Sequence, residues 1–264
     1  MNSIIYKSTW GMPGTLDNHL AAIAAAGYDG ISLNPTRLSQ TELIALPRKL
    51  NEHDLKLVSV GQCQTANDVA ELIRLTVASG GQQVVVHDGR DSMTWDEGCR
   101  FYEASLKLEQ VSSLPVVHET HRTRILFTPW VTSAYLRQFP ELTICADLSH
   151  WVTVCERLLD DCADDLDLAI ARTRHTHLRV GHAEGPQVND PRASEWAAEV
   201  RTHFGWWDRI ARGHATRNET FAATVELGPP NYLQTLPYTN QPVANLSDIG
   251  QWMLAETRAM AARI

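Results

Sequence analysis

Four short polar segments in the second half of the chain combine carboxylates with imidazoles, the side chains that hold divalent metal ions and move protons. Three of the segments come at the end of a short apolar or β-branched run, and the one at 175–179 lies within a run expected to be a strand. The segments are His118-Glu119-Thr120-His121-Arg122, Asp147-Leu148-Ser149-His150, His175-Thr176-His177-Leu178-Arg179 and Val225-Glu226-Leu227-Gly228. If the runs are neighbouring parallel strands, all four segments meet at one rim of a sheet.

One set of four residues is expected to converge on a single point: Glu119, Asp147, His177 and Glu226. Three carboxylates in a partly dry cavity would repel one another, and protonating all of them at neutral pH is implausible. One divalent metal ion removes that repulsion. Three oxygen ligands and one nitrogen favour a fairly hard ion, Mn²⁺ foremost, with Mg²⁺, Co²⁺ or Zn²⁺ as alternatives. No cysteine joins the set, which disfavours a structural zinc site.

Each of these residues alone is more often a strand-end carboxylate paired with an arginine, but four on successive strands favour a metal site. His150 is either a further ligand, a donor to substrate or a structural residue. Successive side chains of a strand point to opposite faces, so His175, His177 and Arg179 are all expected to point into the barrel. His87 and His121 stay open between substrate binding and structure, and His118 is expected to face a layer of helices.

The elements that must position these residues alternate regularly along the chain. Strands are expected at 3–9, 28–33, 55–60, 82–87, 115–119, 142–147, 174–180 and 221–227. Helical patterns occupy 15–26, 39–53, 65–79, 94–112, 131–138, 153–172, 192–211 and 247–263, with Thr15 and Ser247 as N-caps. Eight strand–helix units predict an α/β protein that is a single (β/α)₈ TIM barrel, whose site lies at the carboxyl ends of the strands. A doubly wound sheet is disfavoured, because the first strand lacks a Gly-x-Gly-x-x-Gly motif.

Nothing in the sequence divides the chain, so residues 1–264 are interpreted as one domain. The long gap at about 181–220 contains several glycines and prolines and is expected to be a loop–helix insertion over one end of the barrel.

The composition indicates a globular protein with a sizeable core, since 44% of its 264 residues are hydrophobic and 20% are charged. The formal net charge of −8 disfavours nucleic acid as a partner. No run approaches the length of a membrane span, and no secretory signal is evident, so no membrane partner is expected. Five scattered cysteines without a C-x-x-C pair suggest reduced thiols and a cytoplasmic protein.

In their order and strand placement, these segments resemble the xylose-isomerase-like TIM-barrel superfamily, the sugar-phosphate isomerase/epimerase group related to endonuclease IV. Gly27-Tyr28-Asp29-Gly30-Ile31 at the second strand adds to the resemblance, which covers nearly the whole chain. It implies that Glu119, Asp147, His177 and Glu226 hold the metal and that the two glutamates are catalytic, moving protons on opposite faces of the substrate. It also implies that His150 and Arg179 contact substrate and that a homo-oligomer is possible.

The chain departs from the family pattern at three places. An acidic residue often follows Gly-Tyr-Asp-Gly-Ile, where this chain has Ser32. Endonuclease-IV-type enzymes need a histidine on strand three and an Asp-x-His pair after strand seven. Here those segments read Val60-Gly61-Gln62-Cys63 and Asp190-Pro191-Arg192, which argues against a three-metal phosphoesterase.

The expected function is a metal-dependent isomerase or epimerase acting on a small sugar or keto-polyol through a metal-stabilised enediolate. His150, Arg179, His87, His121 and Trp10 are the candidate substrate-binding residues. Trp130 and Trp151, like Trp10, could shield the substrate from water or merely pack loops. The alternatives are a metal-dependent dehydratase, the phosphoesterase just described, and a binding protein without catalysis.

Overall fold

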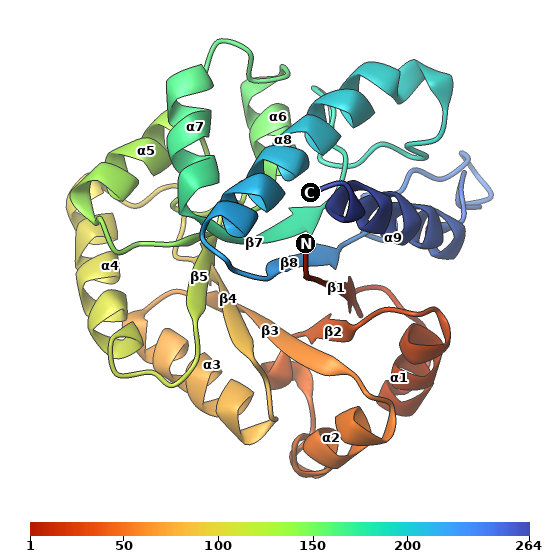
Figure 1. Cartoon of the computed structure of the whole chain (residues 1–264), viewed down its shortest axis with the longest axis horizontal. Coiled ribbons are helices and arrows are strands. Elements are labelled where there is room, and N and C mark those ends of the chain that lie inside the picture. The colour runs from red at the N-terminus through yellow and green to blue at the C-terminus, as the bar shows by residue number, and fades with distance from the viewer.

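Eight parallel strands close into a barrel in the order β1 to β8, with β8 paired back to β1 (Figure 1). The computed structural model describes all residues, 1–264. The strands are β1 Ser3–Ser8, β2 Gly30–Leu33, β3 Lys56–Cys63, β4 Gln83–Asp88, β5 Val116–Glu119, β6 Ile144–Ala146, β7 Thr173–Leu178 and β8 Phe221–Val225. The closed sheet confirms the predicted (β/α)₈ fold.

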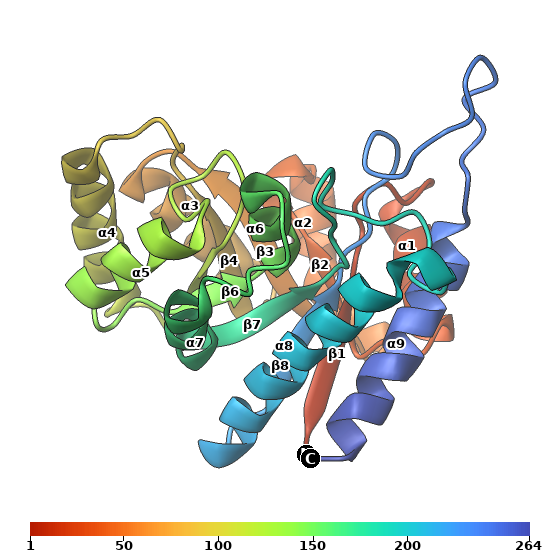
Figure 2. The ribbon, with the colours of Figure 1, turned by 90° about the horizontal axis from the view of Figure 1, so that it is seen from above.

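Helices surround the barrel, as the two views in Figures 1 and 2 show. They are α1 Leu16–Ala25, α2 Gln40–Glu52, α3 Ala66–Ala78, α4 Trp95–Glu109, α5 Pro129–Gln138, α6 Leu148–Cys155, α7 Ala163–Arg172, α8 Ala197–Thr216 and α9 Leu246–Ala262. Short 3₁₀ turns occur at Pro35–Arg37 and Ser194–Trp196. Thr15 caps α1 as predicted, because its hydroxyl accepts a hydrogen bond from the Asn18 backbone N–H. No helix combines the length and apolar character that crossing a bilayer requires.

Three helix predictions were wrong in their details, among them the helix expected at 192–211, which runs from Ala197 to Thr216. The segment 153–172 forms two helices, not one, because Glu156 adopts a left-handed conformation (φ 53°) that ends α6. Helix α6 also begins earlier than predicted, directly after Asp147, whose carboxylate accepts a hydrogen bond from the Ser149 backbone. Helix α9 is capped by Asn245 instead of Ser247.

Two long connections lie near the carboxyl ends of β7 and β8. Residues 181–196 form a loop with one 3₁₀ turn, and α8 then packs in the outer ring against α7 and α9. The second connection, residues 226–245 between β8 and α9, was not anticipated from the sequence. This loop extends away from the barrel at the upper right of Figure 2.

The core has two layers. A small apolar cluster fills the barrel interior, and it consists of Tyr6, Val58, Val85, Val117 and Cys145. The larger cluster lies between the sheet and the helices. Inside the barrel, the ring of His175 is 2.8 Å from both Gln83 Oε1 and Thr224 Oγ1, so this buried imidazole is fully hydrogen-bonded. The carboxyl end of the barrel is left for the polar groups described next.

Candidate active site

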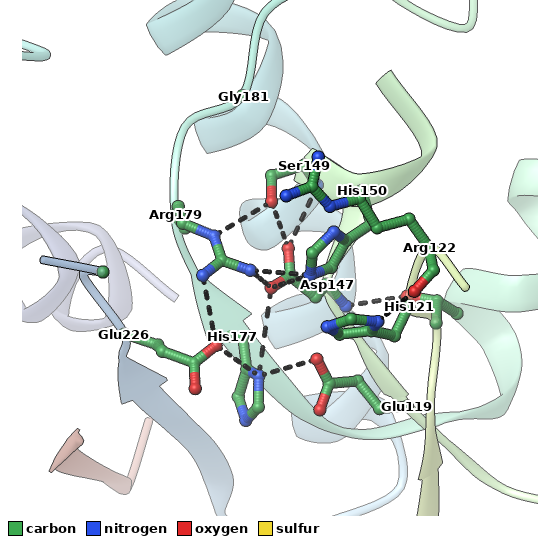
Figure 3. A network of polar contacts seen from close by, with 12 residues as sticks. Glu119, His121, Arg122, Asp147, Ser149, His150, His177, Arg179, Gly181 and Glu226 are labelled. Carbon is green, nitrogen blue, oxygen red and sulfur yellow. Dashed lines mark hydrogen bonds and ion pairs between the residues drawn. The ribbon is translucent and has the colours of Figure 1, made fainter. Parts of the chain in front are cut away.

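The carboxyl ends of β5, β6, β7 and β8 bring together Glu119, Asp147, His177 and Glu226, all of them buried (Figure 3). One ligand atom from each lies within 4.8 Å of those of the other three. The Nδ1 atom of His177 is 3.3 Å from Glu119 Oε1, 3.2 Å from Glu226 Oε2 and 3.9 Å from Asp147 Oδ2. Four residues that are far apart in the sequence therefore face one point.

These four residues fit a divalent cation, for two reasons visible in the structure. First, both carboxylate oxygens of Glu119 and both ring nitrogens of His177 are buried and lack a hydrogen bond of normal geometry, although His87 contacts Glu119; a bound cation would satisfy them. Second, the three carboxylates and the guanidinium of Arg179, which contacts Asp147, leave two negative charges if His177 is neutral. A divalent ion balances those charges and suits an O₃N donor set.

Arg179 supports two of the three carboxylates. It is almost fully buried, its Nη2 contacts Asp147, and its Nη1 lies 3.4 Å from Glu226 Oε2. Its Nε donates to Ser149 Oγ at 3.2 Å, and Nη2 also lies 2.8 Å from His150 Nε2. Burial raises the pKa of Asp147 above its ordinary value, and the adjacent guanidinium opposes that rise.

Three imidazoles form one wall of the site. His87 contacts Glu119 through Nε2 and stacks on His121 at 4.9 Å between ring centroids. His121 lies 3.9 Å from His150 by the same measure, and burial lowers the pKa of His121 to about 3. Burial likewise lowers the pKa of His150. Glu119, His121 and His150 form a second group whose potential ligand atoms lie within 4.8 Å of one another, so Glu119 is common to two possible sites.

A cavity of about 850 Å³ opens above the four residues. Glu226, Arg179, His87 and His121 line its inner part, and it extends over the ends of β1 to β3. Trp10, which is 37% exposed, also lines the cavity. The cavity therefore extends from Glu226, the one residue of the cluster in its lining, to the loops on the other side of the barrel.

Trp130 and Trp151 do not line this cavity, and the shielding role considered for them is wrong. Trp130 is exposed near the start of α5. Trp151 is fully buried and donates a hydrogen bond from Nε1 to the backbone carbonyl of Leu126 at 3.0 Å. His118 faces the helix layer as predicted, with its ring nitrogens 2.7 Å from Asp88 and 2.9 Å from Glu109.

Tyr232 is the site residue that the sequence did not indicate. It comes from the 226–245 loop, and its ring centroid lies 5.0 Å from Arg179 Cζ and 5.1 Å from Arg122 Cζ. Trp10 packs edge-on against the same ring at 4.8 Å. No periodic pattern marks a residue in an irregular loop, so only the Gly228-Pro229-Pro230 run signalled that the chain turns there.

No protein-family model matches the sequence, and no curated protein matches it. Solved structures do match the fold. An L-ribulose 3-epimerase has a TM-score of 0.67 at 12% identity, over 99% of this chain and 95% of its own. A D-allulose 3-epimerase from Methylomonas sp., in complex with D-allulose, gives 0.65 at 12% identity, over 98% and 97%. A probable 3-DHS dehydratase from Bacillus anthracis gives 0.64 at 14% identity, over 99% and 100%.

Other matching structures are xylose isomerase domain proteins. The chain therefore shares the TIM-barrel fold of these structures. At such low identities the likeness defines the fold, and the activity has to be argued from the site itself.

Proposed function

We propose that this protein is a divalent-metal-dependent isomerase or epimerase of a small sugar or keto-polyol. The observation that carries the proposal is the buried cluster of Glu119, Asp147, His177 and Glu226, with its unsatisfied polar atoms, at the base of a large cavity. The ribulose and allulose epimerases of the same fold support the choice of substrate class.

The four residues would hold the ion, Mn²⁺ foremost, with Mg²⁺, Co²⁺ or Zn²⁺ as alternatives. When bound, a divalent cation polarises the carbonyl and neighbouring hydroxyl of a ketose or aldose and so acidifies the C–H bond beside them. Glu119 and Glu226 approach His177 Nδ1 from different strands, and Figure 3 shows them on either side of it. This arrangement suits one carboxylate to remove a proton and the other, once protonated, to return it.

The product depends on where the proton returns. Return to the opposite face of the same carbon inverts one stereocentre, which is epimerisation. Return to the neighbouring carbon interconverts an aldose and a ketose. We propose that His150, Arg179, His87, His121 and Trp10 bind the substrate, because they surround the cluster or line the cavity above it.

A dehydratase is the second candidate, and the observation that favours it is the dehydratase of the same fold, which matches over nearly the full length of both chains. The first step is shared, because a carboxylate again removes a proton, but a β-hydroxyl then leaves as water. A three-metal phosphoesterase is not favoured, since the β3 end contributes Gln62 to the cavity where such a site needs a histidine.

Metal content per chain, measured by plasma mass spectrometry after dialysis against Mn²⁺ and then buffer, tests the proposal. We expect about one ion in the wild type and none in His177→Ala, because that substitution removes the nitrogen ligand. Arg100→Gln, an exposed change on α4, is the control and should keep its ion. Wild-type protein without metal would contradict the proposal, whereas two ions would place a second one at Glu119, His121 and His150.

Reactions of a panel of ketoses in D₂O then separate the two activities. An isomerase or epimerase should incorporate deuterium into recovered sugar without loss of water, whereas a dehydratase should release an unsaturated product. Glu119→Gln and Glu226→Gln should each slow the exchange by about 10²-fold or more, the usual size of a general acid–base contribution.

A further inference from the structure

Three arginines line the cavity without an ion pair to any carboxylate of the chain: Arg37, Arg122 and Arg124. Many other arginines on this acidic protein do pair with carboxylates, for example Arg48 with Glu52. Five further arginines also lack an ion pair, but none of them lines this cavity, so the three in it are set apart by their common location.

Arg122 is held in place by an aromatic ring instead of by an anion. Its Cζ lies over the ring of Tyr232 at 5.1 Å from the centroid, and its guanidinium makes no hydrogen bond within the chain. A cation–π contact occupies the face of a guanidinium and leaves the N–H groups at its edge free. Arg122 is thus a fixed donor that lacks an acceptor.

Arg124 lies two residues further along the same loop and contributes a second free donor. Its Nη1 donates to the backbone carbonyl of Gly89 at 2.9 Å, which anchors the side chain at the end of β4. Its Nε is buried and has no hydrogen-bond partner. A buried cationic N–H without an acceptor is unfavourable unless a ligand supplies one.

Two carboxylates line the same cavity, and both have partners within the chain. Glu42 accepts hydrogen bonds from the Ser39 backbone at 2.9 Å and from its hydroxyl at 2.7 Å, as part of the capping box of α2. Glu226 lies against His177 and Arg179. The cavity therefore presents three arginines without a carboxylate partner, and Glu42, bonded to Ser39 through Oε2, is the one carboxylate in its lining that forms no ion pair.

The position of Arg122 relative to the metal cluster limits the size of the ligand. Tyr232 contacts Arg122 and also lies 5.0 Å from Cζ of Arg179, which itself contacts Asp147. Arg179 is shared with the cluster, because its Nη2 contacts Asp147, its Nε donates to Ser149 and its Nη1, which makes no hydrogen bond, lies 3.4 Å from Glu226 Oε2. One short molecule can reach both the cluster and the free edge of Arg122.

We propose that the substrate is a small anionic polyol, bearing a phosphate ester or a carboxylate, and that Arg122 binds its anionic group with help from Arg124. The inference rests on the proposed function, which it narrows to charged substrates. Phosphate and carboxylate share the paired oxygen acceptors that a guanidinium edge recognises.

Calorimetric titration of the Mn²⁺-loaded protein tests this with two matched ligand pairs. One pair is a ketopentose and its 5-phosphate, and the other is a ketohexose and the keto acid with the same carbon chain. We expect the charged member of at least one pair to bind about tenfold tighter or more, the usual effect of a charge-assisted hydrogen bond. Which pair shows the preference identifies the phosphate or the carboxylate.

Variants establish whether Arg122 is responsible. Arg122→Gln should abolish the preference, Arg122→Lys should restore part of it, and Arg124→Gln should weaken it. Arg100→Gln removes the same charge outside the cavity and should behave as wild type. Absence of a preference in both pairs, or an unchanged preference in Arg122→Gln, would overturn the inference. Metal content measured on every sample keeps that failure distinct from a failure of the metal site.

Discussion

The buried imidazole of His203 on α8 holds the segment that follows Arg179. Its Nε2 accepts a hydrogen bond from the Gly181 backbone N–H at 3.2 Å, and its Nδ1 lies 2.8 Å from the Glu199 carbonyl. The ring must therefore be neutral, with its proton on Nδ1, to make both bonds. Burial lowers its pKa from 6.5 to about 4, which agrees with that assignment.

This histidine should make stability depend on pH. The unfolded chain takes up a proton near pH 6.5 and the folded chain only near pH 4, so the free energy of unfolding falls as the pH drops between these values. The expected loss is about 3 kcal/mol, because each pH unit between the two pKa values contributes about 1.4 kcal/mol. Urea unfolding of wild type and His203→Gln at several pH values measures it.

Glutamine keeps an uncharged acceptor for Gly181 but does not titrate, so His203→Gln should lose about 3 kcal/mol less than wild type across this range. Equal pH dependence of the two proteins would contradict the prediction. The comparison cancels the other titrating groups, which both proteins share.

At the scale of single residues, the candidate metal cluster was well located from the sequence, because strand ends in a barrel fix where Glu119, Asp147, His177 and Glu226 must lie. Contacts between residues of different loops could not be predicted from the sequence. Arg122 was visible beside His121, but its contact with Tyr232 joins two irregular loops whose conformations no periodic pattern determines. The fixed position of Arg122 therefore became evident only in the folded chain.

Among the elements, α6 and the segment that follows β7 pass very close to each other near the site. A Cβ on Gly181 would lie 2.8 Å from both Cα and the carbonyl oxygen of Ser149, so a side chain there must displace backbone. Arg179, two residues earlier, donates to Ser149 and contacts Asp147. Movement of this segment should therefore disturb the candidate metal ligand as well as the packing.

We expect Gly181→Ala to lower the free energy of unfolding by about 1–3 kcal/mol, as overpacking does, and to weaken Mn²⁺ binding. Gly205→Ala on α8 is the matched control, because no atom lies within 4 Å of its added Cβ. That change should stabilise the protein by about 0.5–1 kcal/mol through helix propensity. Urea unfolding and Mn²⁺ titration measure both effects, and wild-type Mn²⁺ affinity in Gly181→Ala would refute the link between packing and the cluster.

The elements themselves were predictable where hydrophobic periodicity is strong, and all eight strands lie where β-branched runs predicted them. The errors have local causes. Asp147 acts as a helix cap as well as a candidate ligand, so α6 begins immediately after β6. The left-handed Glu156 is not a glycine, so no residue type in the sequence signalled the break that follows.

For the whole molecule, an ion held by four strands should contribute to global stability. Glu119, Asp147, His177 and Glu226 are contributed by β5 to β8, and the unfolded chain cannot hold them together. Binding to the folded state alone stabilises by about 2.7 kcal/mol when free ion is at 100 times its Kd. For a chain of this size, about 1 kcal/mol corresponds to a rise of roughly 2–4 °C in Tm.

Calorimetry with and without Mn²⁺ should therefore show a higher Tm in wild type and no change in His177→Ala. EDTA should reverse the rise. An equal rise in both proteins would mean that the ion binds elsewhere. The closed barrel was predictable from the count and spacing of strands. The stabilisation of the folded chain by a bound ion depends on side-chain positions that only the fold reveals.

The two halves of the barrel contribute differently to the site. The candidate metal ligands all come from β5 to β8, whereas the far wall of the cavity comes from the loops after β1 to β3. In evolutionary terms, the candidate metal ligands and Arg122, the proposed anion ligand, are inherited on one stretch of the gene and the far wall of the cavity on another. A chimera that takes its first half from another barrel of this fold would then reshape the far wall while preserving both the chemistry and the recognition of the anionic group.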